Sequence, residues 1–268
     1  MRLEIKWQSI IIGTVDCGRT HRSNDRIFSG IIKSFSRRLR KKNVRKEMNC
    51  GEITRAVWAA GQCMKQLDLL VQDMTSPSGT DVEALADEEV AALREESVIM
   101  AYTFSGELLQ PASTTSDHKK LYGLNVNQIA DILRSYVLYE FDPSHPIIAE
   151  IIAHVQDRIA NGDYIKTVDI SRILWSLQRL RVPVDIQFVS KLVQSFSDNT
   201  QANNHDTCSP KTLNTILRSV ALMVSDHGNY LPELYETASL SLLSDAKYLS
   251  KCNEFECSNF IWSISLAR

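Results

Sequence analysis

Cysteines and histidines are the residues in this chain that could hold a metal or form a redox centre. No two of the six cysteines form a CxxC pair. Cys252 and Cys257 are separated by four residues, but neither a second pair nor a nearby histidine completes a zinc site. The six histidines are scattered without ligand spacing. We therefore expect reduced thiols, no bound metal and no cofactor. The cysteines are Cys17, Cys50, Cys63, Cys208, Cys252 and Cys257.

Basic side chains are concentrated near the N-terminus. Residues 1–50 hold 13 Lys and Arg against 4 Asp and Glu, and of the chain's 30 basic and 32 acidic residues this leaves 17 basic and 28 acidic in the remainder. A dense basic run suits phosphate binding, a targeting receptor or plain solvation, and these interpretations stay open. The run includes Arg37, Arg38, Arg40, Lys41 and Lys42.

Motifs of the common catalytic sites are absent from the sequence. There is no Gly-rich phosphate loop, no GxSxG and no HExxH. The paired acidic residues at 88–89 and 95–96 are better explained as a solvated helix face than as catalytic carboxylates. We therefore predict a binding protein without a small-molecule substrate rather than an enzyme.

Composition indicates which elements position these side chains. The 268 residues include only 10 Gly and 7 Pro, which favours helices over sheets with frequent turns. An apolar content of 44% is sufficient for a core. No apolar run approaches the length that spans a bilayer, and the first segment lacks a secretory cleavage pattern. We expect an intracellular protein without a membrane partner.

A segment of eleven residues recurs five times, and we call each copy a B segment. The copies start 76, 41, 43 and 44 residues apart, and three of these spacings suit two-helix repeats. Positions 1, 4, 5 and 8 are apolar, which is one face of an α-helix, and position 7 is always Ala or Ser. The copies are ITRAVWAAGQC from Ile53, IADILRSYVLY from Ile129, ISRILWSLQRL from Ile170, LNTILRSVALM from Leu213 and CSNFIWSISLA from Cys257.

A looser apolar helix, the A segment, is predicted before each B segment. We expect these A segments at 27–42, 81–102, 145–160, 184–196 and 231–245. Each A–B pair predicts a helical hairpin, and the hairpins predict an all-α solenoid of about five repeats over 26–268. A basic, poorly structured segment is expected at 1–25, and polar loops at 73–80, 104–123 and 197–209. Because the last B segment is as apolar as an internal one, we expect further repeats or a protein partner at that end, so that this would be a fragment of a longer array.

The B segment resembles the N-x-hydrophobic-W-A-hydrophobic-A helix of octotricopeptide-type repeats, a pattern shared with FAST-kinase-like and RAP-domain proteins. VWAA at 57–60, LWSL at 174–177 and IWSI at 261–264 carry the resemblance, and Asn259 lies close to the family's Asn position. Arg134 and Arg218 replace the Trp in two copies, and no RAP segment follows. The resemblance implies a solenoid that binds single-stranded RNA in mitochondria or plastids and governs its maturation, stability or translation. Without it, the expected location is the cytoplasm.

Two positions of the B segment are candidate RNA contacts. Position 6 holds Trp58, Arg134, Trp175, Arg218 and Trp262, which could stack bases and pair phosphates. For the Trp residues we prefer the alternative, packing against the adjacent repeat. Position 3 holds Arg55, Asp131, Arg172, Thr215 and Asn259, which fits a base reader or, as we prefer, an ordinary solvated face.

A protein-interaction scaffold of the armadillo or HEAT type is the alternative to RNA binding. It would use the same surface for a peptide or a helix. The charge of that surface discriminates the two, because an acidic or neutral groove favours a protein partner and a basic one favours RNA.

Overall fold

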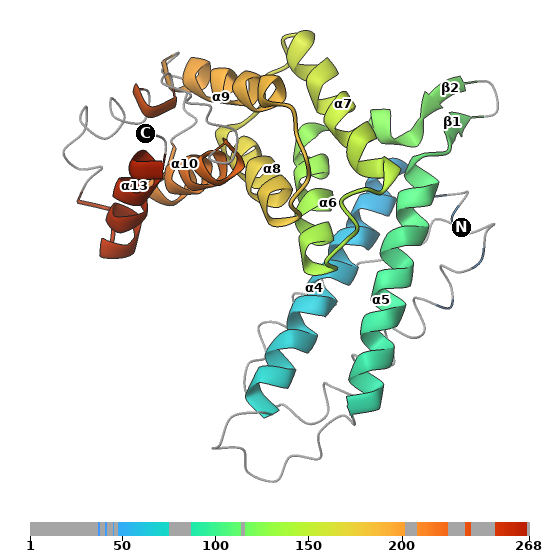
Figure 1. Ribbon diagram of the computed structural model, residues 1–268. Coiled ribbons are helices and arrows are strands. Elements are labelled where there is room, and N and C mark those ends of the chain that lie inside the picture. Colours follow the sequence, from blue (N-terminus) through green and yellow to red (C-terminus); the bar gives the residue numbers. More distant parts are fainter. Residues whose placement is uncertain are drawn as a thin grey trace. The chain divides into compact units, whose positions relative to one another are not determined.

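The computed structural model describes residues 37, 41, 45, 48–74, 87–113, 116–201, 208–224, 234–236 and 250–266 (Figure 1). The chain divides into two compact units, Met1–Gly123 and Leu124–Arg268. Nearly all elements of the described ranges are helices, so the all-α prediction is confirmed. Within these ranges, no helix has both the length and the apolar character needed to span a membrane.

The described part of unit 1 consists mainly of two long helices and a short strand pair. The helices α4 (Cys50–Met74) and α5 (Asp87–Leu108) lie side by side (Figure 1). Strands β1 (Pro111–Ser113) and β2 (Ser116–Lys119) are antiparallel, and the 3₁₀ turn η1 (Lys120–Gly123) contacts both helices. The Cys50 thiol donates a hydrogen bond to the Lys120 carbonyl oxygen at 3.0 Å, which ties η1 to the start of α4.

Unit 2 contains the last four B segments, each on its own helix. These are α6 (Val126–Leu138), α8 (Thr167–Arg179), α10 (Pro210–Val224) and α13 (Glu254–Leu266), and each packs on the next in chain order. The helices α7 (Pro146–Ala160) and α9 (Ile186–Gln201) come from the predicted A segments at 145–160 and 184–196 and contact each other. We refer to α6, α8, α10 and α13 as the B helices of unit 2.

The apolar positions of the first four B segments form the core, as the helical spacing predicts, whereas in α13 Ile261 and Ile264 of the same stripe are exposed. In α6, α8 and α10 every side chain at positions 1, 4, 5 and 8 is 0% exposed. The serines at position 7 are also buried, so their small size lets neighbouring helices approach closely. The apolar residues are Ile129, Ile132, Leu133, Tyr136, Ile170, Ile173, Leu174, Leu177, Leu213, Ile216, Leu217 and Val220.

Three helices that carry B segments, α4, α6 and α13, begin with the same reciprocal cap. In each, the side chain of an Asn at the N-cap accepts a hydrogen bond from the backbone N–H of the residue three positions later. The Glu or Gln side chain of that later residue accepts a hydrogen bond from the backbone N–H of the Asn. The donor–acceptor distances lie between 2.8 and 3.0 Å. This capping box satisfies backbone donors that the helix leaves open, and it starts the helices in one register. The pairs are Asn49–Glu52, Asn125–Gln128 and Asn253–Glu256.

The helices α6 and α8 also end alike. Glu140 and Arg181, the residues that follow the two C-caps, adopt left-handed conformations with φ of 50° and 56°. The N–H groups of Phe141 and Val182 then donate to carbonyl oxygens five residues earlier, at 3.0 Å in both cases. This is the Schellman arrangement, in which the next apolar side chain folds back on the helix. The helices α6 and α8 therefore end in the same way and bury the same positions.

The predicted loops at 104–123 and 197–209 require correction. The first begins inside α5, because Phe104 and Leu108 continue its buried face, and it contains β1, β2 and η1. The second begins inside α9, where the buried Asn199 side chain donates to the Ile165 carbonyl oxygen at 2.7 Å. Of the loop predicted at 73–80, residues 73 and 74 belong to α4 and the rest lies outside the described residues. The segment at 1–25 also lies outside them, as do most of the A segments at 27–42 and 231–245.

Candidate nucleic-acid interface

Each B helix of unit 2 has one side that is not buried, and we call these four sides together the B-helix face. It consists of the residue two before each B segment and of positions 3, 6 and 10. These spacings of four, three and four residues place the side chains on one side of a helix, opposite the buried stripe. None of them is buried. The residues are Asn127, Asp131, Arg134, Leu138, Val168, Arg172, Trp175, Arg179, Lys211, Thr215, Arg218, Leu222, Phe255, Asn259, Trp262 and Leu266.

Charge on the B-helix face is predominantly basic. Its basic residues are Arg134, Arg172, Arg179, Lys211 and Arg218, and its one acidic residue is Asp131. The charged residues of the A-segment helices α7 and α9 are Glu150, Asp157, Arg158, Lys191 and Asp198. Within the described part of unit 2, positive charge is therefore collected on this side of the B helices, whose other sides carry Asp169, Glu254 and Glu256. The chain as a whole has a formal net charge of -2. Such segregation produces a local field that attracts anions.

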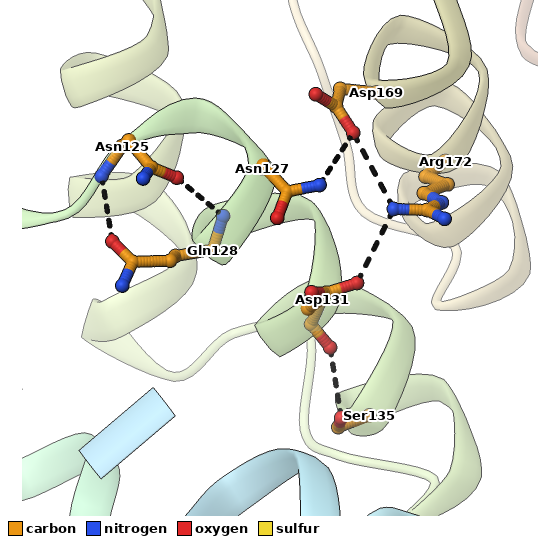
Figure 2. A network of polar contacts seen from close by, with 7 residues as sticks. All are labelled: Asn125, Asn127, Gln128, Asp131, Ser135, Asp169 and Arg172. Atoms are coloured by element: carbon orange, nitrogen blue, oxygen red, sulfur yellow. Dashed lines mark hydrogen bonds and ion pairs between the residues drawn. The ribbon is translucent and has the colours of Figure 1, made fainter. Parts of the chain in front are cut away.

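A polar network joins α6 to α8 across this face (Figure 2). Arg172 donates to Asp131 Oδ1 at 3.4 Å and to Asp169 Oδ1 at 3.5 Å, and Asn127 Nδ2 donates to the same Asp169 oxygen at 3.1 Å. The Asp169 side chain is 4% exposed, whereas those of Asp131 and Arg172 are 30% and 33% exposed. The network neutralises the buried Asp169 carboxylate, so its role is to support the packing of α8 against α6.

Burial dominates the electrostatics of Asp131. It raises the pKa of this carboxyl above its ordinary value, and the nearby Asp169 carboxylate acts in the same direction. Arg172 and Arg134 oppose the rise but do not reverse it. The ionised form of Asp131 is therefore less favoured in the folded protein than in water, despite the adjacent guanidinium.

A different contact joins α10 to α13. The Arg218 side chain donates to Asn259 Oδ1 at 3.5 Å, and its guanidinium carbon lies 5.6 Å from the Trp262 ring centroid. This cation–π contact connects two successive position-6 residues. Trp262 is 39% exposed and Arg218 is exposed, so both groups remain accessible.

The remaining predicted site residues fall into three groups. Arg134 is exposed on α6, and Thr215 donates its hydroxyl to the Lys211 carbonyl oxygen at 2.8 Å. Arg55 is exposed on α4 and belongs to unit 1. Arg37 and Lys41 are exposed, whereas Arg38, Arg40 and Lys42 lie outside the described residues.

The B-helix face also includes basic residues that the sequence reasoning did not select. Arg179 and Lys211 are exposed and follow or precede the chosen positions by four residues on the same helix side. The helical period that located the buried stripe could have located them. Trp58 and Trp175 are half-buried, so these rings, like that of Trp262, belong to the surface layer rather than to the deep core.

Comparisons with protein-family models, with curated proteins and with solved structures found no match to this chain. The resemblance to octotricopeptide-type repeats stays a prediction, and the functional argument depends on the residues described above.

Proposed function

We propose that this protein is an RNA-binding helical-repeat protein whose B-helix face holds single-stranded RNA. The supporting observation is that basic and Trp side chains lie together on this surface while the A-segment helices carry a mixed charge. Lys and Arg neutralise phosphates, and exposed aromatic rings stack bases that no partner strand covers. RNA of this form offers both groups at once, whereas a duplex hides the flat faces of its bases.

The position-6 column supplies the repeating part of the proposed interface. Successive helices present Arg134, Trp175, Arg218 and Trp262, so each repeat offers either a charge or a ring. This alternation serves backbone and stacking contacts, which tolerate any base. Position 3 contributes less to recognition, because Arg172 is held between two carboxylates. We propose binding without a base-by-base code.

The resemblance stated above extends the proposal. It favours a continuous solenoid of about five hairpins, a location in mitochondria or plastids, and a role in RNA processing, stability or translation. The protein acts by holding RNA rather than by catalysis.

A protein-interaction scaffold is the second candidate function, because α13 exposes large apolar side chains. Phe255 is 67% exposed and Ile261 is 71% exposed, although the residues equivalent to Ile261 in α6, α8 and α10 are fully buried. Exposed apolar clusters of this kind are typical of protein contacts. This surface lies on α13, which carries none of the basic residues of the B-helix face, so a protein partner there leaves the basic part of that face available.

Titration of the full chain with labelled single-stranded RNA, at low and moderate salt, tests the proposal. We expect binding that weakens with salt, and we expect Lys211→Gln to lower the magnitude of the slope of log affinity against log salt by about 0.7. Lys191→Gln is the matched control, since Lys191 is exposed on α9, away from the B-helix face. If RNA binds at neither salt concentration, the proposal of RNA binding is refuted. If the two variants have equal effects, RNA does not bind at the B-helix face.

A further inference from the structure

Two positions at the start of a helix often carry apolar side chains that pack on each other. They are the residue before the N-cap (N′) and the fourth helical residue (N4), and the arrangement is called a hydrophobic staple. In α6, which has a capping box, the residues at these positions are Leu124 and Ile129, and in α8, which has none, they are Ile165 and Ile170. All four are buried.

In α13 the same two positions are occupied by thiols. Cys252 is the N′ residue and Cys257 the N4 residue, on either side of the Asn253–Glu256 capping box. The two reciprocal hydrogen bonds of that box, at 2.8 and 3.0 Å, fix the turn between the cysteines. Cys252 and Cys257 are not joined in a disulfide, and the Cys257 thiol is a hydrogen-bond partner of Cys252.

The two thiols differ in their surroundings. Cys257 is exposed, whereas Cys252 is half-buried. Burial raises the pKa of the Cys252 thiol, and Cys257 and Glu256 add to that rise. An oxidant in solution therefore meets Cys257 first, and Cys252, its hydrogen-bond partner across the capping box, is placed to react second.

We propose that Cys252 and Cys257 are a modification site, a dithiol that closes reversibly to a disulfide across the first turn of α13. The oxidant is a small-molecule disulfide such as oxidised glutathione. The Cys257 thiolate attacks one of its sulfurs and releases the first glutathione thiolate. The Cys252 thiolate then attacks the Cys257 sulfur, forms the Cys252–Cys257 bond and releases the second. Two electrons pass to oxidised glutathione, and the two thiol protons end on the released glutathione.

The closed disulfide would hold α13 at its N-terminal turn. A covalent bond between the N′ and N4 residues, where α6 and α8 have apolar side chains, restricts the opening of that turn. Since α13 also carries Asn259 and Trp262, the two partners of Arg218, this modification would stabilise the contact between α10 and α13. The proposed dithiol does not depend on RNA binding.

The test uses the reduced full chain incubated in glutathione buffers of increasing oxidised fraction, then acid-quenched, alkylated and digested with trypsin. Cleavage after Lys251 yields peptide 252–268, which contains Cys252 and Cys257 and no other cysteine. We expect this peptide to lose two hydrogens and to escape alkylation. Cys252→Ser and Cys257→Ser should each replace that product by a mixed disulfide with glutathione.

Cys208 provides the matched control, because it occupies the N′ position of α10 opposite Leu213, which has no thiol. Cys208→Ser should leave the yield of the internal disulfide unchanged. Repeating the oxidation in urea measures what the fold contributes, and we expect the native chain to favour closure about tenfold over the unfolded one. Stable glutathione adducts in place of the internal disulfide on the wild-type peptide, or equal closure in urea and in buffer, would overturn the proposal.

Discussion

The contact between α6 and α8 and the contact between α10 and α13 each use an arginine of the B-helix face, but for different purposes. At the first, the position-3 residue Arg172 lies between two carboxylates, one of them nearly buried. At the second, the position-6 residue Arg218 touches a neutral amide and an aromatic ring. Arg172 therefore compensates charge within the protein, whereas Arg218 retains a net positive charge for a ligand. A basic residue on a repeat face contributes to binding only when the neighbouring helix leaves its charge uncompensated.

The largest expected effect comes from removing the guanidinium of Arg172. Arg172→Met should destabilise unit 2 by about 2–3 kcal/mol, because Asp169 stays buried without its cation. Urea unfolding of the full chain at pH 7, followed by circular dichroism, measures the loss. Arg218→Met is the comparison variant, and its free energy of unfolding should change by less than about 0.5 kcal/mol, since no buried charge depends on it. Equal losses in the two variants would remove the distinction between the two contacts.

The second expected effect is on RNA affinity, and here the Arg218 variant should lose more than the Arg172 variant. Arg218→Gln should weaken single-stranded RNA binding about fivefold, because one phosphate contact and the cation–π support of Trp262 are lost together. Arg172→Met, assayed at a temperature where it is fully folded, should change the affinity less than twofold. Fluorescence anisotropy with one labelled RNA gives both values. If the Arg172 variant loses as much affinity as the Arg218 variant, the network of Figure 2 takes part in binding and the comparison fails.

Periodicity within the chain was sufficient to predict the helices that carry the B segments and the buried faces of all of them except α13, where Ile261 and Ile264 are exposed. Ile129, Ile170 and Leu213 are each completely buried, as the common stripe requires. The caps were also present in the sequence, since an Asn followed three residues later by Glu or Gln precedes three B segments, but this signal was not used. The hairpin at 111–119 was not predicted because its polar residues resemble a loop, and pairing depends on neighbours rather than on period. The continuous solenoid stays a prediction.

The site was harder to predict than the fold. Helical spacing placed Arg134, Arg172 and Arg218 on one helix side, and the structure agrees. Which of them is neutralised depends on how far the next helix is shifted along its neighbour. Asp131 and Arg172 are 41 residues apart in sequence, and only packing brings them within 3.4 Å. A single sequence holds no measure of that shift.

The smallest effect concerns pH and separates the two contacts again. Because the folded-state pKa of Asp131 is raised above its ordinary value, folding favours the protonated carboxyl. Stability from this group is fully present below the unfolded pKa of about 4 and is lost as pH rises through the folded pKa. Asp131→Asn should therefore raise the free energy of unfolding at pH 7, by less than about 1 kcal/mol because the side chain is partly exposed.

The gain from Asp131→Asn should shrink to nothing as the pH falls below about 4, where the wild-type carboxyl is itself uncharged. Urea unfolding of both proteins at pH 7, 5 and 3.5 measures this convergence. The contact of Arg218 with Asn259 and Trp262 contains no group that titrates in this range, so Asn259→Ala should cost the same at every pH. A loss of stability from Asp131→Asn at pH 7 would mean that attraction to Arg172 outweighs burial. The contact between α6 and α8 would then be a stabilising salt bridge in its own right, rather than a buried charge made tolerable by its neighbour.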